Sequence, residues 1–225
     1  MVKIPPYLKK GDLIGITCSS SKMDLVAAEY ARGVISSWGY RVHLGITAGT
    51  SFHNFSAPDE LRLEELQDML DDPDIKAIVF GRGGYGMVCI LDKLDFTRFR
   101  KHPKWLCGYS DITALHSHVQ RQCGIATLHS VMCSGITPNT IDDEYVHSLA
   151  AALKGKPYRY TAPAHPLNRE GKTSGILVGG NLSMLANLSG TPSQINTKGK
   201  ILLLEDIGEY RYNIDRMMYN LKRAG

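Results

Sequence analysis

The chain has 225 residues, of which 43% are hydrophobic and 21% charged, a composition typical of a globular protein with one or two domains. The 26 Lys and Arg residues barely outnumber the 22 Asp and Glu residues and are scattered, which argues against a nucleic-acid-binding protein. No apolar run approaches the roughly 20 residues that span a bilayer, and the N-terminal MVKIPPYLKKGD lacks the apolar core of a signal peptide, so we expect a cytoplasmic protein with no membrane segment.

Strands and helices alternate through the first part of the chain. Apolar runs predict strands, and helical spacing of apolar residues predicts the segments between them. The predicted strands cover 11–20, 40–45, 75–80, 104–110 and 124–130, and the predicted helices 23–39, 57–74, 86–95 and 111–122. The acidic residues of the helix over 57–74 fall on positions that we expect to be exposed. This alternation predicts an α/β fold with a Rossmann-like, mostly parallel sheet flanked by helices.

The texture of the sequence changes after residue 140. A short helix over 147–155 precedes a polar, proline-containing stretch, and a strand, a Gly-Gly-Asn turn and a helix then occupy 175–191. An apolar strand over 199–209 and an amphipathic helix over 211–225 follow. We predict an N-terminal Rossmann-like domain (1–140), a linker or crossing segment (141–174) and an incomplete C-terminal α/β domain (175–225), since domains below roughly 60 residues are marginal.

The glycines at 81, 83 and 86 follow a predicted strand with the spacing G-x-G-x-x-G. A dinucleotide site would also need an acidic residue at the tip of the next strand, and KWLCGYS ends in serine instead. The loop offers unobstructed backbone N–H groups, which suit a carboxylate or a developing oxyanion, and Arg82 adds a cation. The alternative is a tight turn that requires positive φ.

Ser110 lies between a predicted strand and a predicted helix, the position of the serine in a nucleophile elbow. The usual G-x-S-x-G spacing is absent, because Ile112 or Thr113 stands where the second glycine would be. Serine is also among the preferred N-caps, and Asp111 suits the first turn of a helix, so a cap is the alternative interpretation.

Glu205 ends an apolar strand, where a half-buried carboxylate can hold a catalytic imidazole in one tautomer. Asp206 and Glu209 compete for this role, and a solvated strand-end carboxylate is the alternative. Of the eight histidines, His129 is the one predicted at the same sheet edge as Ser110. The five cysteines contain no C-x-x-C pair and indicate neither a disulfide framework nor a zinc site.

Five blocks in order along the chain resemble the LD-carboxypeptidase family of serine peptidases, which includes the microcin C immunity enzymes: GDLIGITCSSS, GRGGYG, GYSDITALH, GGNLSMLANLSGTP and LLLEDIGEYRYNIDRMMYNLKRAG. The resemblance implies that Ser110 is the nucleophile and Glu205 the acid of a Ser-His-Glu triad. It implies an oxyanion hole from the N–H groups of Asp111 and Gly84, and a substrate pocket lined by Arg82, Gly83 and Tyr85.

The resemblance further implies cleavage of an amide between an L-centre and a D-amino acid, such as the terminal D-alanine of a murein tetrapeptide. The alternative substrate that it implies is a peptide- or aminoacyl-nucleotide. It also implies a homodimer that needs neither a metal nor a cofactor. The chain departs from the family at TLHSVM, where T-x-H-G-P-M is usual. The family's catalytic histidine follows the C-terminal helix, so we expect it beyond Gly225, with the 225 residues alone inactive. A muropeptide- or peptide-binding protein without turnover is the alternative, and a nucleotide-dependent enzyme ranks third.

Overall fold

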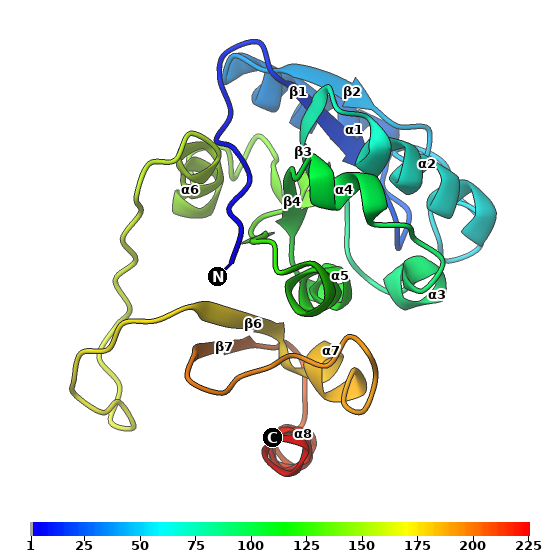
Figure 1. The fold of residues 1–225 in the computed structure, drawn as a ribbon. Coiled ribbons are helices and arrows are strands. Elements are labelled where there is room, and N and C mark those ends of the chain that lie inside the picture. The colour runs from blue at the N-terminus through cyan, green and yellow to red at the C-terminus, as the bar shows by residue number, and fades with distance from the viewer. Residues whose placement is uncertain (1) are drawn as a thin grey trace.

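Five parallel strands form the main sheet of the computed structural model, which describes residues 2–225. They stand in the order β2-β1-β3-β4-β5 (Figure 1). Their bounds are β1 Leu13–Thr17, β2 Arg41–Leu44, β3 Ile75–Phe80, β4 Trp105–Gly108 and β5 Leu128–His129. The order reverses between β1 and β3, and ligands of such sheets bind at the carboxyl ends of the strands beside a reversal. The segments that follow β1, β3 and β4 therefore meet at the edge where a site is expected.

Helices cover both faces of this sheet. Their bounds are α1 Leu25–Ser37, α2 Asp59–Asp71, α3 Met87–Leu91, α4 Thr97–Lys101, α5 Thr113–His118 and α6 Glu144–Leu153. Ala77 and Val79 of β3 belong to a buried cluster with α1 and α6, whereas Ile78 and Phe80 belong to a cluster with α2 to α5. Successive strand residues point to opposite faces, so β3 is buried on both sides, as its continuous apolar run predicts.

Several elements differ from their predicted bounds. The segment after β4 is a 3-10 turn (Ser110–Ile112), then α5, then a π-helical turn (Val119–Cys123) that ends at Gly124, where φ is +65°. The strand predicted over 124–130 is shorter in the structure, where β5 covers Leu128–His129. Ile125 forms an isolated bridge to Lys3 near the N-terminus and does not extend β5. Helix α4 was not predicted, and α6 begins earlier than expected and contributes buried apolar side chains to the α1 cluster.

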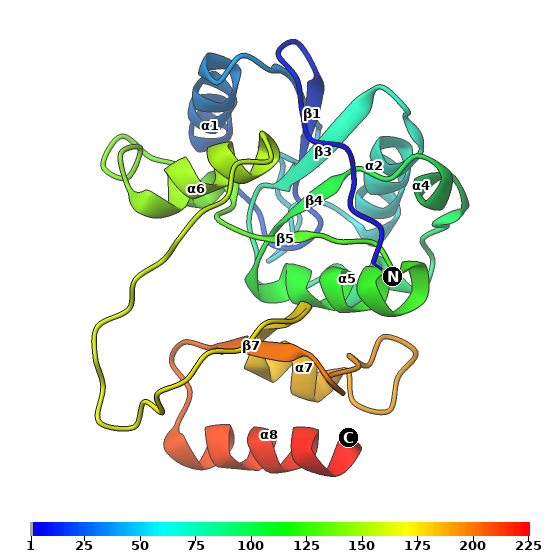
Figure 2. The same cartoon turned by 60° about the vertical axis from the view of Figure 1, so that its left-hand side comes forward.

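A second, smaller α/β unit follows α6. It consists of β6 (Leu177–Asn181), α7 (Leu182–Asn187), β7 (Ile201–Glu205) and α8 (Arg211–Ala224), with β6 and β7 paired in parallel. Figure 2 shows α5 between the main sheet and this unit. Helix α8 lies on the side of the β6–β7 pair that faces away from α5. The fold class predicted from the sequence is confirmed, whereas the division at residues 140 and 174 remains a prediction. No helix within residues 2–225 is both long and apolar enough to span a membrane.

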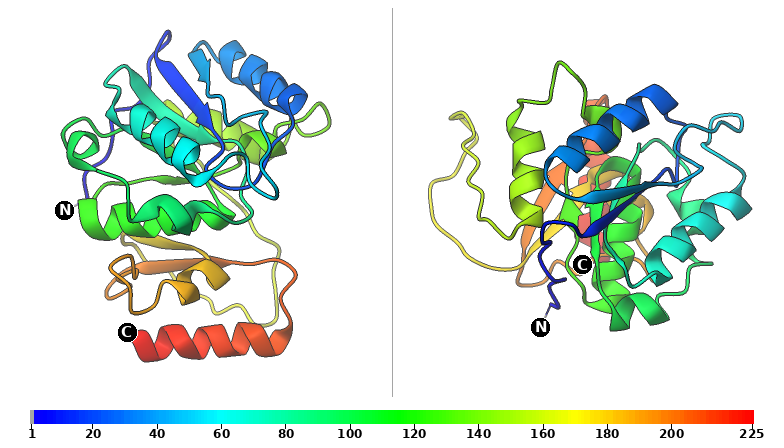
Figure 3. Two further views of the ribbon diagram at one scale, coloured as in Figure 1. Left: turned by 90° about the vertical axis from the view of Figure 1, so that its right-hand side faces the viewer. Right: turned by 90° about the horizontal axis from the view of Figure 1, so that it is seen from above.

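The second unit is attached to the first through α5. Thr113 Oγ1 accepts a hydrogen bond from the backbone N–H of Asn181 (3.1 Å), and Ser117 Oγ donates to the carbonyl oxygen of Ser193 (2.6 Å). A Cβ on Gly180 would lie 2.7 Å from Thr113 Oγ1, so the two units approach closely there. The chain that connects them is exposed over 154–177 and extends away from the body of the protein in the right-hand view of Figure 3.

Replacement of Gly179 should destabilise the second unit. Gly179 has a φ of +135°, and a Cβ would overlap the carbonyl oxygen of Leu203 in the paired strand. We expect Gly179→Ala to lower the free energy of unfolding by about 1–3 kcal/mol in urea titrations. Gly33→Ala is the matched control, because Gly33 lies in α1 with open space around it, and it should raise stability by about 0.5–1 kcal/mol. Equal effects of the two substitutions would contradict this account of β6.

Candidate active site

Ser110 stands in a strained turn directly after β4. Its φ is +60°, in the left-handed region that non-glycine residues rarely occupy. Strain of this kind is typical of functional sites and of the nucleophile elbow. The cap position of the following 3-10 turn is Tyr109, and it makes no side-chain cap hydrogen bond. The geometry therefore matches an elbow better than the alternative N-cap.

The missing second glycine of the elbow has a structural explanation. A Cβ on Gly108 would lie 3.1 Å from Cγ1 of Ile112, so the Ile112 side chain packs over the glycine that precedes the turn. Ile112 itself is fully buried. In this chain the turn is packed closely by Gly108, two residues before Ser110, and by the large side chain of Ile112, two residues after it.

The glycine loop lies against Ser110. A Cβ on Gly83 would be 3.1 Å from both Cβ and Oγ of Ser110, so any side chain at this position would crowd the hydroxyl. Gly84 has a φ of +109°, and a Cβ there would overlap Ser21 Oγ. Ser21 also donates its backbone N–H to the carbonyl oxygen of Gly83 (3.2 Å). Close approach thus favours glycine at both positions, and at Gly84 the backbone conformation requires it as well.

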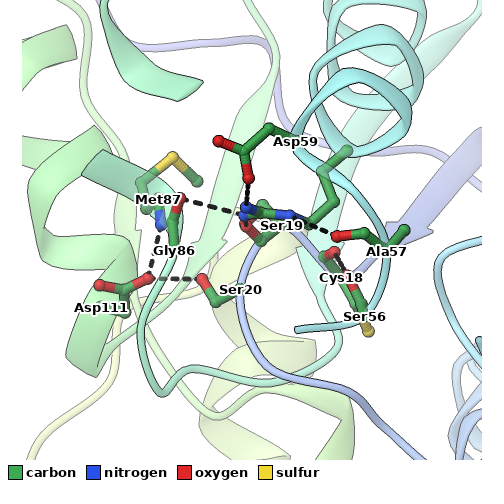
Figure 4. A network of polar contacts seen from close by, with 10 residues as sticks. Cys18, Ser19, Ser20, Ser56, Ala57, Asp59, Gly86, Met87 and Asp111 are labelled. Atoms are coloured by element: carbon green, nitrogen blue, oxygen red, sulfur yellow. Dashed lines mark hydrogen bonds and ion pairs between the residues drawn. The ribbon is translucent and has the colours of Figure 1, made fainter. Parts of the chain in front are cut away.

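A buried polar network behind the loop, drawn in Figure 4, was not predicted from the sequence. One oxygen of Asp111, Oδ2, accepts hydrogen bonds from Ser20 Oγ (2.5 Å) and from the backbone N–H of Met87 (2.8 Å). Arg62 is fully buried, and it donates to the carbonyl oxygens of Gly86 (3.0 Å), Ala57 (3.0 Å) and Ser19. The sequence suggested Asp111 for its backbone N–H group and for the first turn of a helix, not for a buried side-chain contact.

The position of Arg62 in its helix carries a signal for this burial. Leu66, Met69 and Leu70 follow it at helical spacing, and all three are buried, so Arg62 lies on the apolar face of α2. Glu65 is likewise an exception to the predicted exposure of the acidic residues in α2. Its carboxylate accepts hydrogen bonds from Thr17 Oγ1 (2.7 Å) and from Thr47 Oγ1 (2.5 Å) and N (3.0 Å).

Glu205 and His129 approach each other across the two units. The distance from His129 Nε2 to Glu205 Oε1 is 3.9 Å, and within residues 2–225 this carboxylate oxygen is buried without a hydrogen-bond partner. Burial raises the pKa of Glu205, an effect that the Asn181 side chain opposes, and burial lowers the pKa of His129. Both residues lie at predicted strand ends, and the structure brings these strand ends together.

The competing acids are engaged elsewhere. Asp206 accepts hydrogen bonds from the backbone N–H groups of Ser183 (2.9 Å) and Ile207 (2.8 Å), so it stabilises the first turn of α7. Glu209 accepts from Asn213 Nδ2 (3.0 Å). Of the three candidates, Glu205 is the one whose carboxylate faces an imidazole.

The remaining predicted pocket residues lie on the outer side of the loop. Arg82 is exposed, and Nη1 is 3.5 Å from the carbonyl oxygen of Lys22. Tyr85 is 59% exposed, with its ring 6.0 Å from that of Phe55. Both side chains are accessible to a ligand. Within the part of the chain that the structure describes, no group of three or more His, Cys, Asp or Glu side chains is arranged to hold a metal ion.

A cavity of about 360 Å³ adjoins the elbow. Its walls come from Tyr109, from the end of β5, from α6 and from the exposed connection, with the lining residues Tyr109, His129, Ser130, Val131, Gly135, Tyr145, Ser148 and Tyr160. The two residues at which the sequence departs from T-x-H-G-P-M, Ser130 and Val131, therefore both line this cavity. The departure changes a wall beside Ser110 rather than the elbow itself.

His116 supports the strand end from which the elbow projects. Its Nε2 lies 2.9 Å from the carbonyl oxygen of Gly108, which can only accept, so Nε2 carries the proton. The backbone N–H of Ser130 donates to the same oxygen (3.0 Å). Burial lowers the pKa of His116 to about 4, so the ring is neutral at neutral pH.

Both parts of the chain match models of one family. The LD-carboxypeptidase N-terminal domain model matches residues 14–130, and the LD-carboxypeptidase C-terminal domain model matches residues 174–225. Nearly all of the five-stranded sheet, the elbow and the glycine loop lie in the first match, and Glu205 lies in the second. The parallel α/β fold and these two models place the chain in a class of peptidase-related proteins. The chain belongs to the LD-carboxypeptidase family, as the motif blocks indicated.

Individual relatives agree with this assignment. The probable murein peptide carboxypeptidase of Bacillus subtilis is 38% identical over 228 residues, which cover 98% of this chain and 70% of that protein. Three other curated relatives are matched over 55–57% of their length. The crystal structure of muramoyltetrapeptide carboxypeptidase from Oxalobacter formigenes is similar with a TM-score of 0.82 at 28% identity, over 95% of this chain and 72% of that one. MccF in complex with glutamyl sulfamoyl guanosine is similar with a TM-score of 0.80 at 25% identity, over 99% and 76%.

The buried neutral His116 should make stability depend on pH. The unfolded state binds a proton at an ordinary histidine pKa of 6.5, whereas the folded state binds one only at about 4, so this contribution is present above pH 6.5 and is lost as the pH falls toward 4. Between pH 7 and pH 5, the wild type should lose about 2 kcal/mol more of its free energy of unfolding than His116→Gln, in which an amide can still donate to Gly108. Parallel pH profiles in urea titrations would contradict a neutral His116.

Proposed function

We propose that this protein is a serine carboxypeptidase that hydrolyses an amide between an L-centre and a D-amino acid. Its substrate class is a small peptide such as a murein tetrapeptide ending in D-alanine, or a related peptide- or aminoacyl-nucleotide. The observation that carries the proposal is Ser110, held at positive φ at the end of β4 with the glycine loop against its hydroxyl.

In the proposed reaction, Ser110 Oγ attacks the scissile carbonyl carbon while an imidazole takes its proton. The backbone N–H groups of Asp111 and Gly84 stabilise the oxyanion that forms, and Glu205 orients the imidazole and stabilises its positive charge. Among the described residues 2–225, the buried Oε1 of Glu205 has no hydrogen-bond donor, which supports this role because the oxygen is available to an imidazole N–H. Collapse of the intermediate transfers the proton to the leaving amine, and water then releases the acyl group.

The relatives support the substrate class. One is named for murein peptides and another for muramoyltetrapeptide, and MccF was solved with an aminoacyl-nucleotide analogue, glutamyl sulfamoyl guanosine. These ligands share an aminoacyl or peptidyl group attached to a larger polar body. The exposed Arg82 and Tyr85 and the tyrosine-lined cavity beside Ser110 provide charged and aromatic surface for such a body.

Activity is assayed in a protein that also carries the catalytic histidine expected beyond Gly225. In that protein, Ser110→Ala should abolish release of D-alanine from a tetrapeptide that ends in D-alanine, because it removes the nucleophilic oxygen alone. Binding of the tetrapeptide, measured by calorimetry, should persist in this variant. Turnover by Ser110→Ala at the wild-type rate would contradict the assignment of the nucleophile. Binding without turnover in the wild type would instead identify a muropeptide-binding protein.

Glu205→Gln should reduce kcat by about 100-fold or more, because an amide can accept from imidazole but cannot stabilise its positive charge. Asp206→Asn is the matched control on the next residue, and it should retain kcat while lowering the free energy of unfolding by about 1 kcal/mol through its weakened contact with α7. A larger loss of kcat in Asp206→Asn would transfer the role of the acid to Asp206.

His129 is tested in the same assay. Its 3.9 Å separation from Glu205 exceeds hydrogen-bond length, so the carboxylate does not fix its tautomer in this structure. We expect His129→Gln to reduce kcat by less than about tenfold, the scale of one lost polar contact near the site. A loss as complete as that in Ser110→Ala would assign the general base to His129.

A further inference from the structure

We infer that the side chains of Arg62 and Asp111 clamp the peptide group between Gly86 and Met87 and thereby hold the glycine loop in position against Ser110. Arg62 and Asp111 are therefore positioning residues. Their expected effect on turnover rests on the hydrolysis proposed above. The contribution of Asp111 through its side chain is separate from the oxyanion contact proposed for its backbone N–H.

The clamp grips both ends of one peptide group. The carbonyl oxygen of Gly86 accepts a hydrogen bond from Arg62 Nη1 (3.0 Å), and the N–H of Met87 donates to Asp111 Oδ2 (2.8 Å). These two atoms belong to the same planar unit, so the two contacts fix its orientation about the chain axis. Figure 4 shows the Asp111 carboxylate facing the Met87 end of this peptide group.

The Arg62 and Asp111 side chains are both buried and are joined through this peptide group, and Arg62 is in addition paired with the Asp59 carboxylate. Arg62 is 0% exposed and Asp111 1% exposed, and a buried charge is costly unless it is paired or hydrogen-bonded. Burial raises the pKa of Asp111, and the hydrogen bonds from Ser20 and Met87 and the charge of Arg62 oppose that rise. A buried cation on one side and a buried carboxylate on the other polarise the peptide in the same direction, which strengthens both hydrogen bonds.

The position of the clamp determines what it controls. Gly86 and Met87 form the junction between the loop and α3, and Gly86 has a φ of +143°. At the other end of the loop, the carbonyl oxygen of Gly81 accepts from the N–H of Ser134 (2.8 Å). The residues between these anchors include Gly83 and Gly84. Release of the peptide group at 86–87 would free one end of the segment that supplies the proposed oxyanion donor.

The clamp also connects the loop to the elbow directly. Asp111 follows Ser110 in the chain, so the residue that carries one proposed oxyanion N–H holds, through its side chain, the loop that carries the other. Displacement of a catalytic group by about 1 Å can cost about 100-fold in rate. The Asp111 side chain is expected to keep the two proposed oxyanion donors in their relative positions, so its loss should affect kcat more than KM.

The test compares Asp111→Ala with Asp111→Asn and Ser20→Ala. Asp111→Ala keeps the backbone N–H and removes the acceptor of Met87, so kcat should fall about 100-fold while KM changes less than about threefold. The amide oxygen of Asp111→Asn can accept from Met87 and should restore kcat to within about tenfold of wild type. Ser20→Ala removes the other hydrogen bond to the same carboxylate oxygen, leaves the peptide clamped, and should reduce kcat by less than about tenfold.

Amide hydrogen exchange provides a readout that does not depend on turnover. The N–H of Met87 should exchange at least about tenfold faster in Asp111→Ala than in wild type, and at the wild-type rate in Ser20→Ala. Ile35→Ala is the stability control, since Ile35 is buried in α1, and it should lower the unfolding temperature without changing kcat or exchange at Met87.

Unchanged exchange at Met87 in Asp111→Ala would overturn the clamp. Faster exchange with unchanged kcat would overturn its role in positioning the loop, as would a loss of kcat in Ile35→Ala comparable to that in Asp111→Ala. If the wild type releases no D-alanine, the proposed hydrolysis fails, and the exchange of Met87 still decides whether the clamp exists.

Discussion

The pairing of β3 with β4 is the constraint on which the candidate site depends. Val79 stands opposite Cys107 in the register of these two parallel strands, so β3 and β4 end at the same level of the sheet. The chain has only a few residues on each side in which to bring Gly83 against Ser110, and a shift of register would separate them. The strands themselves are held by buried side chains on both faces of β3. The chemistry at the sheet edge thus depends on packing in the middle of the sheet.

Helix α5 carries this geometry into the second unit. It begins at the elbow, and its Thr113 hydroxyl accepts the N–H of Asn181, which stands opposite Glu205 in the β6–β7 pair. One short path therefore leads from Ser110 through α5 and β6 to the candidate acid. Ile112 and Thr113, which stand where G-x-S-x-G has its second glycine, both make structural contacts. Ile112 packs on Gly108, and Thr113 forms a hydrogen bond to the second unit.

The sequence was sufficient to predict features that depend on local patterns. The strands β1, β3 and β4, the position of Ser110 at a strand end, and the close backbone approach at the glycine loop all follow from apolar runs and glycine spacing. Arg62 could not be placed in the same way, because the carbonyl oxygens that accept its hydrogen bonds belong to loops near residues 19, 57 and 86. Its place on the apolar face of α2 indicates burial, but its hydrogen-bond partners depend on where the segments near residues 19 and 86 meet the start of α2. The proximity of His129 to Glu205 likewise arises from packing between the two units, which no local pattern encodes.

The exposed connection over 154–177 has a consequence for how the two units stay together. Its residues are exposed throughout, whereas α5 makes hydrogen bonds to the second unit from Thr113 and Ser117. The connection therefore acts as a covalent tether, and the mutual position of the units comes from the interface that α5 forms. Ser110 lies before the tether and Glu205 after it. A protease that cut only this segment would leave a complex of two fragments, each holding part of one candidate site, with that site still assembled.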